Sequence, residues 1–292
     1  MPSRRFQNQR LSRGDTAWGN DLDIRFDNVC FTYPSGVEAV KNVSFMVPSG
    51  QKLAIVGQNG AGKTTLVRHL NGIFRPTSGT VTVGEWDTTG REIAELSARV
   101  GYVFQNPDEQ LFARQVIEDV AFGPRNLGFD ATRTSELVAA ALEATGLTAE
   151  AHSHPHHLSL SERKRVALAA VLAMDTPVVV LDEPTTGQDE HGVRMVGDIV
   201  ASLHEAGRTV IAITHDMDFC AEHFDRVIVM ALGTALADGT PREVFGMTET
   251  LARAAVEPPQ LARLAKRLGW SAVPMTVPEF IEDYAGATGA SA

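Results

Sequence analysis

Four absences limit what this protein can be. No run of apolar residues reaches the roughly 18 needed to span a bilayer as a helix, and no charged-then-apolar signal peptide opens the sequence. If the protein works at a membrane, it is therefore expected to do so as a peripheral subunit. Cys30 and Cys220 are the only cysteines and form no motif, which favours buried thiols in a reducing compartment. The net charge of −10 argues against a general nucleic-acid-binding surface, so no nucleic-acid partner is expected.

Composition divides the 292 residues into three regions. Residues 1–22 are predicted to be a disordered tail, with four arginines ahead of the first acid, Asp15; contact with an anionic membrane surface is the alternative. Residues 23–246 carry the strand and helix signals of one large core. Residues 247–292 are predicted to be a C-terminal helical extension, broken by prolines.

Short β-branched runs alternate with helical windows between residues 23 and 246. The predicted strands are Ile24–Tyr33, Val43–Val47, Leu53–Val56, Thr80–Val83, Val100–Phe104, Val178–Leu181, Thr209–Ile213 and Arg226–Met230. The predicted helices are Leu66–Leu70, Glu92–Ala98, Gln115–Leu127, Thr132–Thr145, Ser159–Met174 and Gly192–Glu205. Apolar strands alternating with helices predict an α/β fold, with a mostly parallel sheet covered by helices. An antiparallel N-terminal β part and a helical subdomain at about 106–175 complete the prediction.

One stretch has the pattern of a phosphate-binding loop. Gly57–Thr65 reads GQNGAGKTT, fits G-x-x-x-x-G-K-[ST], and lies between a predicted strand and a predicted helix. Glycines let successive N–H groups point at phosphate, Lys63 reaches the β- and γ-phosphates, and the Thr64 hydroxyl suits Mg²⁺. A merely flexible Gly-rich turn would leave the Lys63–Thr64 pair unexplained. The residues predicted to bind the nucleotide here are Gly57, Asn59, Gly60, Gly62, Lys63, Thr64 and Thr65.

Two acids follow the apolar strand Val178–Leu181. Asp182 is predicted to hold Mg²⁺ through water, and Glu183 to face the γ-phosphate and polarise the attacking water. Such a pair can also be no more than a negative charge at a helix N-terminus. Four consecutive β-formers before the pair, in a chain with a phosphate loop, favour the first interpretation. The two motifs together predict a P-loop NTPase core that binds ATP and Mg²⁺.

With both motifs in place, residues 24–246 resemble the ATPase subunits of ABC transporters. The resemblance implies that Tyr33 stacks on adenine, with a packed strand aromatic as the alternative. It implies that Gln105 contacts Mg²⁺ or the attacking water and relays movement to a membrane partner. Asp189 resembles the family's aspartate at the dimer seam. His215 resembles the histidine that bonds the γ-phosphate, as a neutral imidazole can. The implied catalytic residues are Glu183, His215 and Gln105, and the implied Mg²⁺ ligands are Thr64, Gln105 and Asp182.

The family's signature, normally LSGGQ, reads LSLSE at Leu158–Glu162. In the family this segment closes over ATP held by another subunit, where its serine and the following helix N-terminus meet the γ-phosphate. Ser159 and the backbone amides can still do so, but Leu160 adds bulk and Glu162 adds negative charge. Ser159–Glu162 is also an S-x-x-E capping box. Both interpretations are kept, and hydrolysis at this half-site stays open.

A more particular resemblance lies in Phe104–Phe112, which reads FQNPDEQLF. This segment, together with Val116–Pro124 and Asp238–Phe245, resembles the ATPase subunits of energy-coupling-factor importers of vitamins and transition-metal ions. The resemblance implies a homodimer, or a heterodimer with a second ABC ATPase, at the cytoplasmic face of the membrane. It also implies a transmembrane coupling subunit near Gln105 and, indirectly, a membrane protein that captures the substrate.

Other interpretations of the sequence remain. The histidine-rich Ala151–His157 invites a metal site, but it lacks a carboxylate or Cys partner and fits a polar loop. The chain could serve another type of ABC transporter, or form the inactive half of a heterodimer. A nucleotide-gated ABC protein without transport, as in DNA repair or translation, is the alternative from another class. The single cassette and the absence of a long heptad run argue against it.

Overall fold

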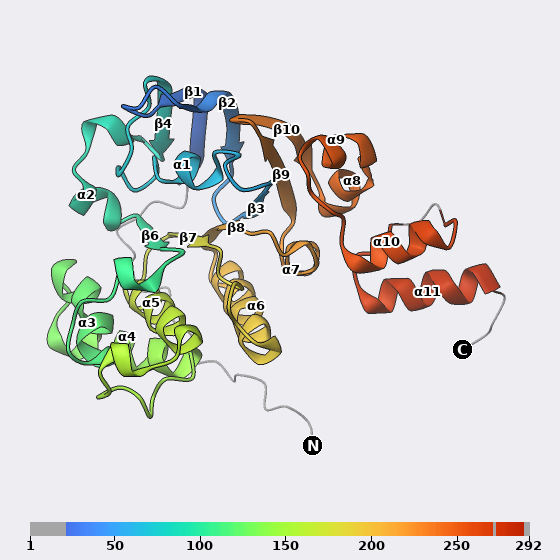
Figure 1. Ribbon diagram of the computed structural model, residues 1–292. Coiled ribbons are helices and arrows are strands. Elements are labelled where there is room, and N and C mark those ends of the chain that lie inside the picture. Colours follow the sequence, from blue (N-terminus) through green and yellow to red (C-terminus); the bar gives the residue numbers. More distant parts are fainter. Residues whose placement is uncertain (1–21, 271–272, 289–292) are drawn as a thin grey trace.

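A computed structural model describes residues 22–270 and 273–288 (Figure 1). The predicted tail lies outside the described residues except for Leu22, which is buried. The strands are β1 Ile24–Thr32, β2 Glu38–Val47, β3 Lys52–Val56, β4 Ser78–Val83, β5 Trp86–Asp87, β6 Val100–Val103, β7 Val178–Asp182, β8 Thr209–Ile213, β9 Arg226–Ala231 and β10 Thr234–Gly239. The α-helices are α1 Lys63–Val67, α2 Ile93–Ser97, α3 Val116–Asn126, α4 Ala131–Ala144, α5 Leu160–Ala173, α6 Glu190–Glu205, α7 Met217–His223, α8 Pro241–Gly246, α9 Thr248–Arg253, α10 Gln260–Arg267 and α11 Val277–Thr288. Thr88–Gly90, Pro107–Glu109 and Pro155–His157 form short 3-10 helices.

The strands form two sheets. The larger sheet has the order β10-β9-β3-β8-β7-β6, and its pairs are parallel except for the antiparallel pair β10–β9. The smaller sheet is antiparallel, with the order β2-β1-β4-β5. The predicted α/β class, with a mostly parallel sheet and an antiparallel N-terminal part, is confirmed.

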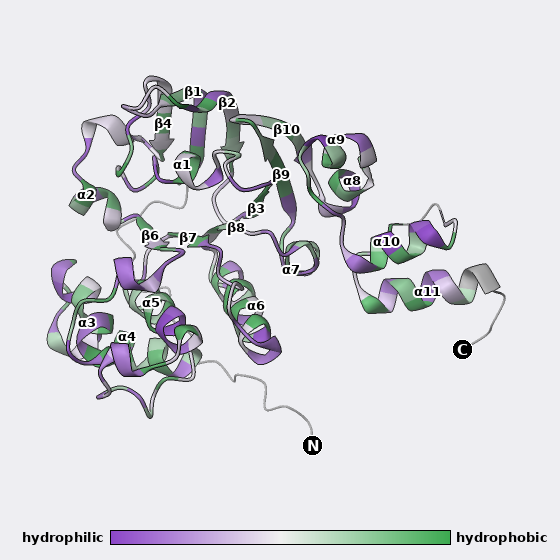
Figure 2. Ribbon diagram, in the orientation of Figure 1, coloured by the Kyte–Doolittle hydropathy of each residue, from purple (hydrophilic) through white to green (hydrophobic). Residues whose placement is uncertain are grey.

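Alternate residues of the central strands face two different cores. Leu53 and Ile55 of β3 pack into a core shared with the small sheet and α1, whereas Ala54 and Val56 pack into a core shared with helices α3 to α7. This alternation follows from the two-residue period of a strand. Because both faces are covered, the central strands are apolar except at their ends, as the mostly green β9 in Figure 2 illustrates.

Residues 106–175 contain helices and turns but no strand, as predicted for a helical subdomain. Asp130 caps α4 and Ser159 caps α5, each accepting a hydrogen bond from a backbone N–H three residues on.

The sequence patterns missed β5, α7 and β10. The strand β10 reads TALADG and lacks the β-branched run that marked the other strands; it forms because it pairs with β9.

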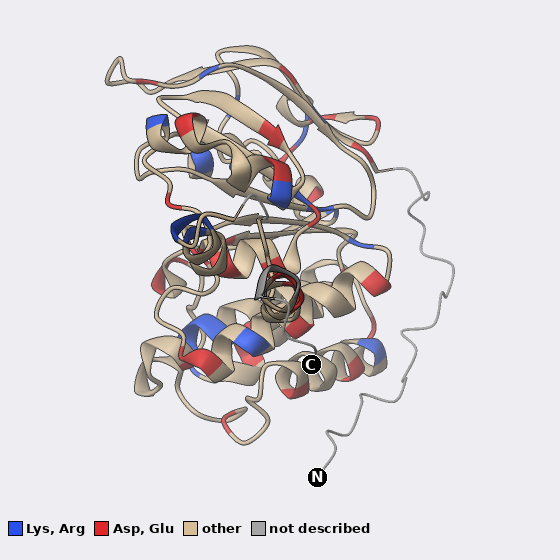
Figure 3. Ribbon diagram, turned by 90° about the vertical axis from the view of Figure 1, so that its right-hand side faces the viewer, with Lys and Arg blue, Asp and Glu red and all other residues tan. Residues whose placement is uncertain are grey.

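The helices α8 and α9 lie beside β9 and β10, whereas α10 and α11 lie further from the sheet (Figure 1). The backbone N–H of Gln260 donates to Oδ1 of Asp218 at 2.8 Å, which connects α10 to α7. Arg242 pairs with Glu279 at 2.9 Å, connecting α8 to α11. Acidic and basic residues are interspersed along the ribbon (Figure 3). Among the described residues, no helix has the length and apolar character needed to cross a membrane.

Candidate functional site

The loop between β3 and α1 is shaped by two glycines that no other residue can replace without movement. A Cβ at Gly57 would lie 2.1 Å from the carbonyl oxygen of Met230, and one at Gly62 would lie 2.2 Å from that of Ala39. Both glycines have positive φ, 147° and 97° respectively. Backbone atoms of two neighbouring segments therefore lie close to the loop at these positions. Glycine fits there and lets the backbone turn tightly, so that its amides can point toward a phosphate.

Lys63 begins α1 and turns back over this loop. Its Nζ donates to the carbonyl oxygens of Gly57, at 2.7 Å, and Gln58, at 3.0 Å. Burial lowers the pKa of Lys63, while the charges of Glu183 and Asp182 act in the opposite direction. The ammonium group is thus fixed inside the loop, where a cation can reach phosphate oxygens.

Asp182 ends β7 with both carboxylate oxygens bonded. Thr64 donates its hydroxyl to Oδ1 at 3.2 Å, and Tyr102 donates its hydroxyl to Oδ2 at 2.8 Å. Burial raises the pKa of Asp182, and the hydrogen bonds from Tyr102 and Thr64 partly offset that rise. The adjacent hydroxyl and carboxylate oxygens of Thr64 and Asp182 fit Mg²⁺, which prefers oxygen ligands.

Glu183 follows with a left-handed backbone, φ 53°. Its N–H donates to the carbonyl oxygen of Ile213 at 2.9 Å, and this bond anchors it to the end of β8. Its Oε2 lies 2.6 Å from Nδ1 of His215 and 3.3 Å from Oγ1 of Thr186. The Glu183 side chain is almost fully buried, whereas that of His215 is 62% exposed. The predicted pair of Glu183 and His215 is therefore in direct contact.

A cavity of about 420 Å³ brings together five of the predicted residues, namely Gly57, Asn59, Gln105, Glu183 and His215, whereas Lys63, Thr64 and Asp182 do not line it. Its size falls within the range of small-molecule sites. Its walls come from the phosphate loop, the loop after β6, the ends of β7 and β8, and the segment after α9. The lining residues are Gly57, Gln58, Asn59, Gln105, Glu183, Thr186, His215, Met217, Ala255, Val256 and Glu257.

Tyr33 lies beside the loop rather than in this cavity. Its hydroxyl is 2.8 Å from Oγ1 of Thr65. Its ring meets those of Phe31 and Phe74 edge to face, with centroids 5.0 and 5.6 Å apart. These contacts support packing as one role of Tyr33, and adenine stacking stays a prediction.

Ser159 and Asp189 do not line the cavity, and each caps a helix. Ser159 accepts from the N–H of Glu162, and its own N–H donates to Oε2 of Glu162 at 2.8 Å, which completes the capping box. The Ser159 hydroxyl also donates to this Oε2, at 2.7 Å. Hydrogen bonds from Ser159 lower the pKa of Glu162. Asp189 accepts from the N–H of Gly192 at 2.8 Å at the start of α6. The contacts of both residues are therefore helix caps, and their roles toward a second subunit stay a prediction.

The histidine-rich loop contains neighbouring imidazoles in a tilted arrangement: the ring centroid of His154 lies 5.5 Å from that of His156 and 5.2 Å from that of His157. Within residues 22–270 and 273–288, no group of three or more His, Cys, Asp or Glu residues is arranged to hold a metal ion.

The sequence patterns missed several residues at the site. Tyr102 and Thr186 contact the two acids, and Lys164 donates to the carbonyl oxygen of Glu183 at 3.1 Å. Val256 and Glu257 line the cavity from the C-terminal extension. The one available signal was the hydroxyl of Tyr102 on an otherwise apolar strand.

The phosphate loop, the buried acid pair and the histidine next to it define a nucleotide hydrolase with a helical subdomain. The chain belongs to the ABC transporter family, whose sequence profile matches residues 40–186. It is one of the family's ATP-hydrolysing subunits, and its resemblance to the energy-coupling-factor group is confirmed.

Two relatives with similar sequences are named as ATP-binding proteins of transporters. The energy-coupling factor transporter ATP-binding protein EcfA of Methanocaldococcus jannaschii is 43% identical over 84% of this chain and 88% of its own length. A longer ABC transporter ATP-binding protein of Methanosarcina acetivorans is 43% identical, and the chain spans 39% of its length.

Solved structures of ABC ATPases have a fold similar to that of this chain. The cbiO1 protein of Clostridium perfringens, part of the transporter complex cbiONQ, is 33% identical over 85% of this chain and 99% of its own, with a TM-score of 0.71. An ATP-binding cassette solved as a dimer with ADP and Pi is 25% identical over 74% of this chain and 98% of its own, with a TM-score of 0.69.

Proposed function

We propose that this chain hydrolyses ATP at the cytoplasmic face of a membrane to power an energy-coupling-factor importer of a vitamin or a transition-metal ion. One observation carries the assignment of hydrolysis. The carboxylate of Glu183, bonded to His215 and Thr186, lines the same cavity as the phosphate-loop residues Gly57 and Asn59. A carboxylate at that place can orient and polarise a water for attack on a terminal phosphate.

The chain's own residues divide the chemistry among them. Lys63 and the loop amides neutralise the phosphate oxygens, which is the main contribution of such loops. Glu183 accepts the hydrogen of the attacking water, and His215 orients the Glu183 carboxylate and contacts the γ-phosphate. Thr64, Asp182 and Gln105 would hold Mg²⁺, which supplies further positive charge when bound.

A second ATPase subunit completes the site in this proposal. Ser159 and the N-terminus of the 14-residue α5 do not line the chain's own cavity, and in this proposal they meet ATP held by the partner. ATP then contacts both subunits and favours the closed dimer, because it binds that state more tightly. The dimeric ABC cassette to which this chain is similar supports such an arrangement.

A transmembrane coupling subunit is the proposed membrane partner. Phe112 and Phe122 are 64% and 49% exposed, with ring centroids 4.7 Å apart, a short distance along the chain from Gln105. Exposed aromatic pairs are typical of interaction surfaces. The cbiO1 relative is part of a multi-protein transporter complex. Substrate specificity would lie in a separate membrane protein.

Two measurements test the proposal. ATPase activity of the purified chain should be lost in Glu183→Gln and retained in the control Glu190→Gln, which changes an exposed acid on α6. Full turnover by Glu183→Gln would make the base assignment wrong. Turnover only after a second ATPase subunit is added would indicate a heterodimer. Failure to associate with any polytopic membrane protein would favour the non-transport alternative.

A further inference from the structure

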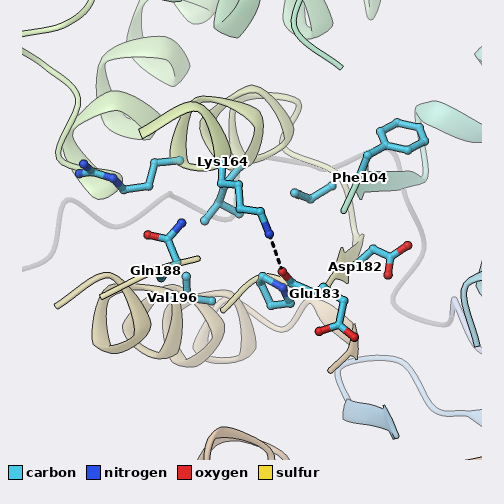
Figure 4. Close-up of a pocket in the computed structure, with 10 residues that line it drawn as sticks. Phe104, Lys164, Asp182, Glu183, Gln188 and Val196 are labelled. Carbon is cyan, nitrogen blue, oxygen red and sulfur yellow. Dashed lines mark hydrogen bonds between the residues drawn. The ribbon is translucent and has the colours of Figure 1, made fainter. Parts of the chain in front are cut away.

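A buried lysine, Lys164, contacts the backbone of Glu183, the proposed base. Lys164, on the second turn of α5, is only 9% exposed. Its Nζ donates to the main-chain carbonyl oxygen of Glu183 at 3.1 Å (Figure 4). Apolar side chains of Val103, Leu168 and Val196 line the small pocket around it. Burying a lysine is costly, so its position calls for a specific partner.

That partner, Glu183, is one of six non-glycine residues with a left-handed backbone among the described residues. Glu183 has φ 53°, a conformation that residues with a Cβ rarely adopt unless neighbouring contacts impose it. Its N–H is bonded to Ile213 and its carbonyl to Lys164, so both backbone polar groups of the residue are fixed. The direction of the Glu183 side chain toward His215 follows from this backbone. Removing the hydrogen bond from Lys164 would leave the carbonyl group of Glu183 without this partner.

The same helix carries the altered signature. Ser161, in the first turn of α5, donates its hydroxyl to Oε1 of Gln188 at 2.6 Å, and the amide of Gln188 donates back to the Ser161 carbonyl at 3.3 Å. Two successive turns of α5 are thus bonded to the segment from Glu183 to Gln188. Movement of the signature end of α5 must act on that segment.

We propose that Lys164 is a positioning residue for Glu183, and that through it α5 couples closure of the signature over the partner's ATP to the base in this subunit's own site. The inference rests on the proposed hydrolysis. Lys164 does not line the nucleotide cavity, so it acts on the orientation of Glu183 rather than on ATP binding.

The test compares two substitutions in the full chain, with the second ATPase subunit present if turnover requires it. Lys164→Met keeps the length and apolar stem but removes the donor, and kcat should fall about 100-fold, the scale expected for a misplaced catalytic group. KM for ATP and ATP-driven dimerisation, measured by size-exclusion chromatography, should stay close to wild type. Lys164→Gln restores an N–H donor and should recover most of the lost kcat.

Arg133→Met is the matched control. Arg133 is a cation of the helical subdomain, on α4, and its ion pairs are with Glu136 and Asp175. Its removal should leave kcat near wild type. The inference is overturned if Lys164→Met keeps wild-type kcat, if it loses ATP binding and dimerisation together with kcat, or if Lys164→Gln recovers nothing. Absence of turnover in the wild-type protein under both conditions would instead overturn the proposed function, and the positioning role with it.

Discussion

The hydroxyl of Tyr102 donates to Oδ2 of Asp182 at 2.8 Å, on the side of the carboxylate opposite Thr64. Burial raises the pKa of Tyr102, with the charge of Asp182 adding to the rise, so the phenol remains a donor. A hydrogen bond of this kind orients a metal-binding carboxylate without touching the metal. Tyr102 is thus a supporting residue for the proposed Mg²⁺ site.

Replacing Tyr102 by Phe tests this role. The ring is retained and only the donor is lost, so the Mg²⁺ concentration for half-maximal ATPase should rise about tenfold, the scale for partners of metal ligands. The measurement is ATPase rate against Mg²⁺ at saturating ATP. Tyr284→Phe, on α11, serves as the control. An unchanged Mg²⁺ requirement would show that Tyr102 only packs.

Tyr33 carries two competing predictions that one pair of variants separates. If its ring stacks on adenine, Tyr33→Ala should weaken ATP binding about tenfold, because stacking of an aromatic ring on a base contributes about 1–3 kcal/mol. Tyr33→Phe should then bind ATP normally, losing only the bond to Thr65. Titration with a fluorescent ATP analogue gives the affinity. A lower Tm with unchanged affinity in Tyr33→Ala would leave packing against Phe31 and Phe74 as the role of this residue.

The parts of the site that could be predicted from sequence are those whose residues are contiguous in the chain. Gly57–Thr65 and Asp182–Glu183 each combine a residue pattern with an adjacent apolar strand, and the strands themselves were evident because both of their faces are buried. Tyr102 and Lys164 reach the acids from 80 and 19 residues away. Their contacts depend on β6 lying beside β7 and on the rotation of α5 about its axis. No local pattern encodes either feature.

The cavity wall formed by Val256 and Glu257 has the same explanation. These residues follow a short helix in a segment whose composition gave only helical pieces. Their place opposite the phosphate loop depends on how α8 and α9 pack beside β9 and β10. The α7 helix was missed because its seven residues are too few for a helical period to be visible.

Glu85 gives the fold a pH dependence whose sign is determined by its pKa. The hydrogen bond from Arg99 is the main cause that holds the pKa of Glu85 at about 2, below its ordinary 4.5. A carboxyl whose pKa is lower in the folded protein stabilises it above the unfolded value, and that contribution is lost as pH falls through the folded value. Wild-type Tm should therefore fall between pH 4.5 and about 2.

Glu85→Gln isolates this contribution. The variant should have a lower Tm than wild type at pH 7, and the difference should shrink as the pH falls toward 2, as measured by circular dichroism melts. A constant difference across that range would assign the effect of Glu85 to packing near Trp86 rather than to its charge.

The altered signature leads to the sharpest prediction about the dimer. Glu162 holds the Ser159 hydroxyl at 2.7 Å, and its lowered pKa keeps it ionised at neutral pH. In the proposed dimer this charge would lie near the phosphates of the partner's ATP. Two like charges about 4 Å apart in water repel by about 1 kcal/mol, which corresponds to roughly a fivefold change in an equilibrium constant.

Glu162→Gln removes that charge and keeps the capping box, because glutamine serves equally at this position. Dimerisation with ATP, followed in the Glu183→Gln background so that nucleotide is not consumed, should tighten by about fivefold. Tm should hardly change, since the cap persists. Glu243→Gln is the control, because Glu243 forms the same capping box with Thr240 at α8, away from the signature. The three proteins compared are Glu183→Gln alone, Glu183→Gln with Glu162→Gln, and Glu183→Gln with Glu243→Gln. Equal dimerisation constants in all three would mean that Leu158–Glu162 does not contact nucleotide in the closed dimer.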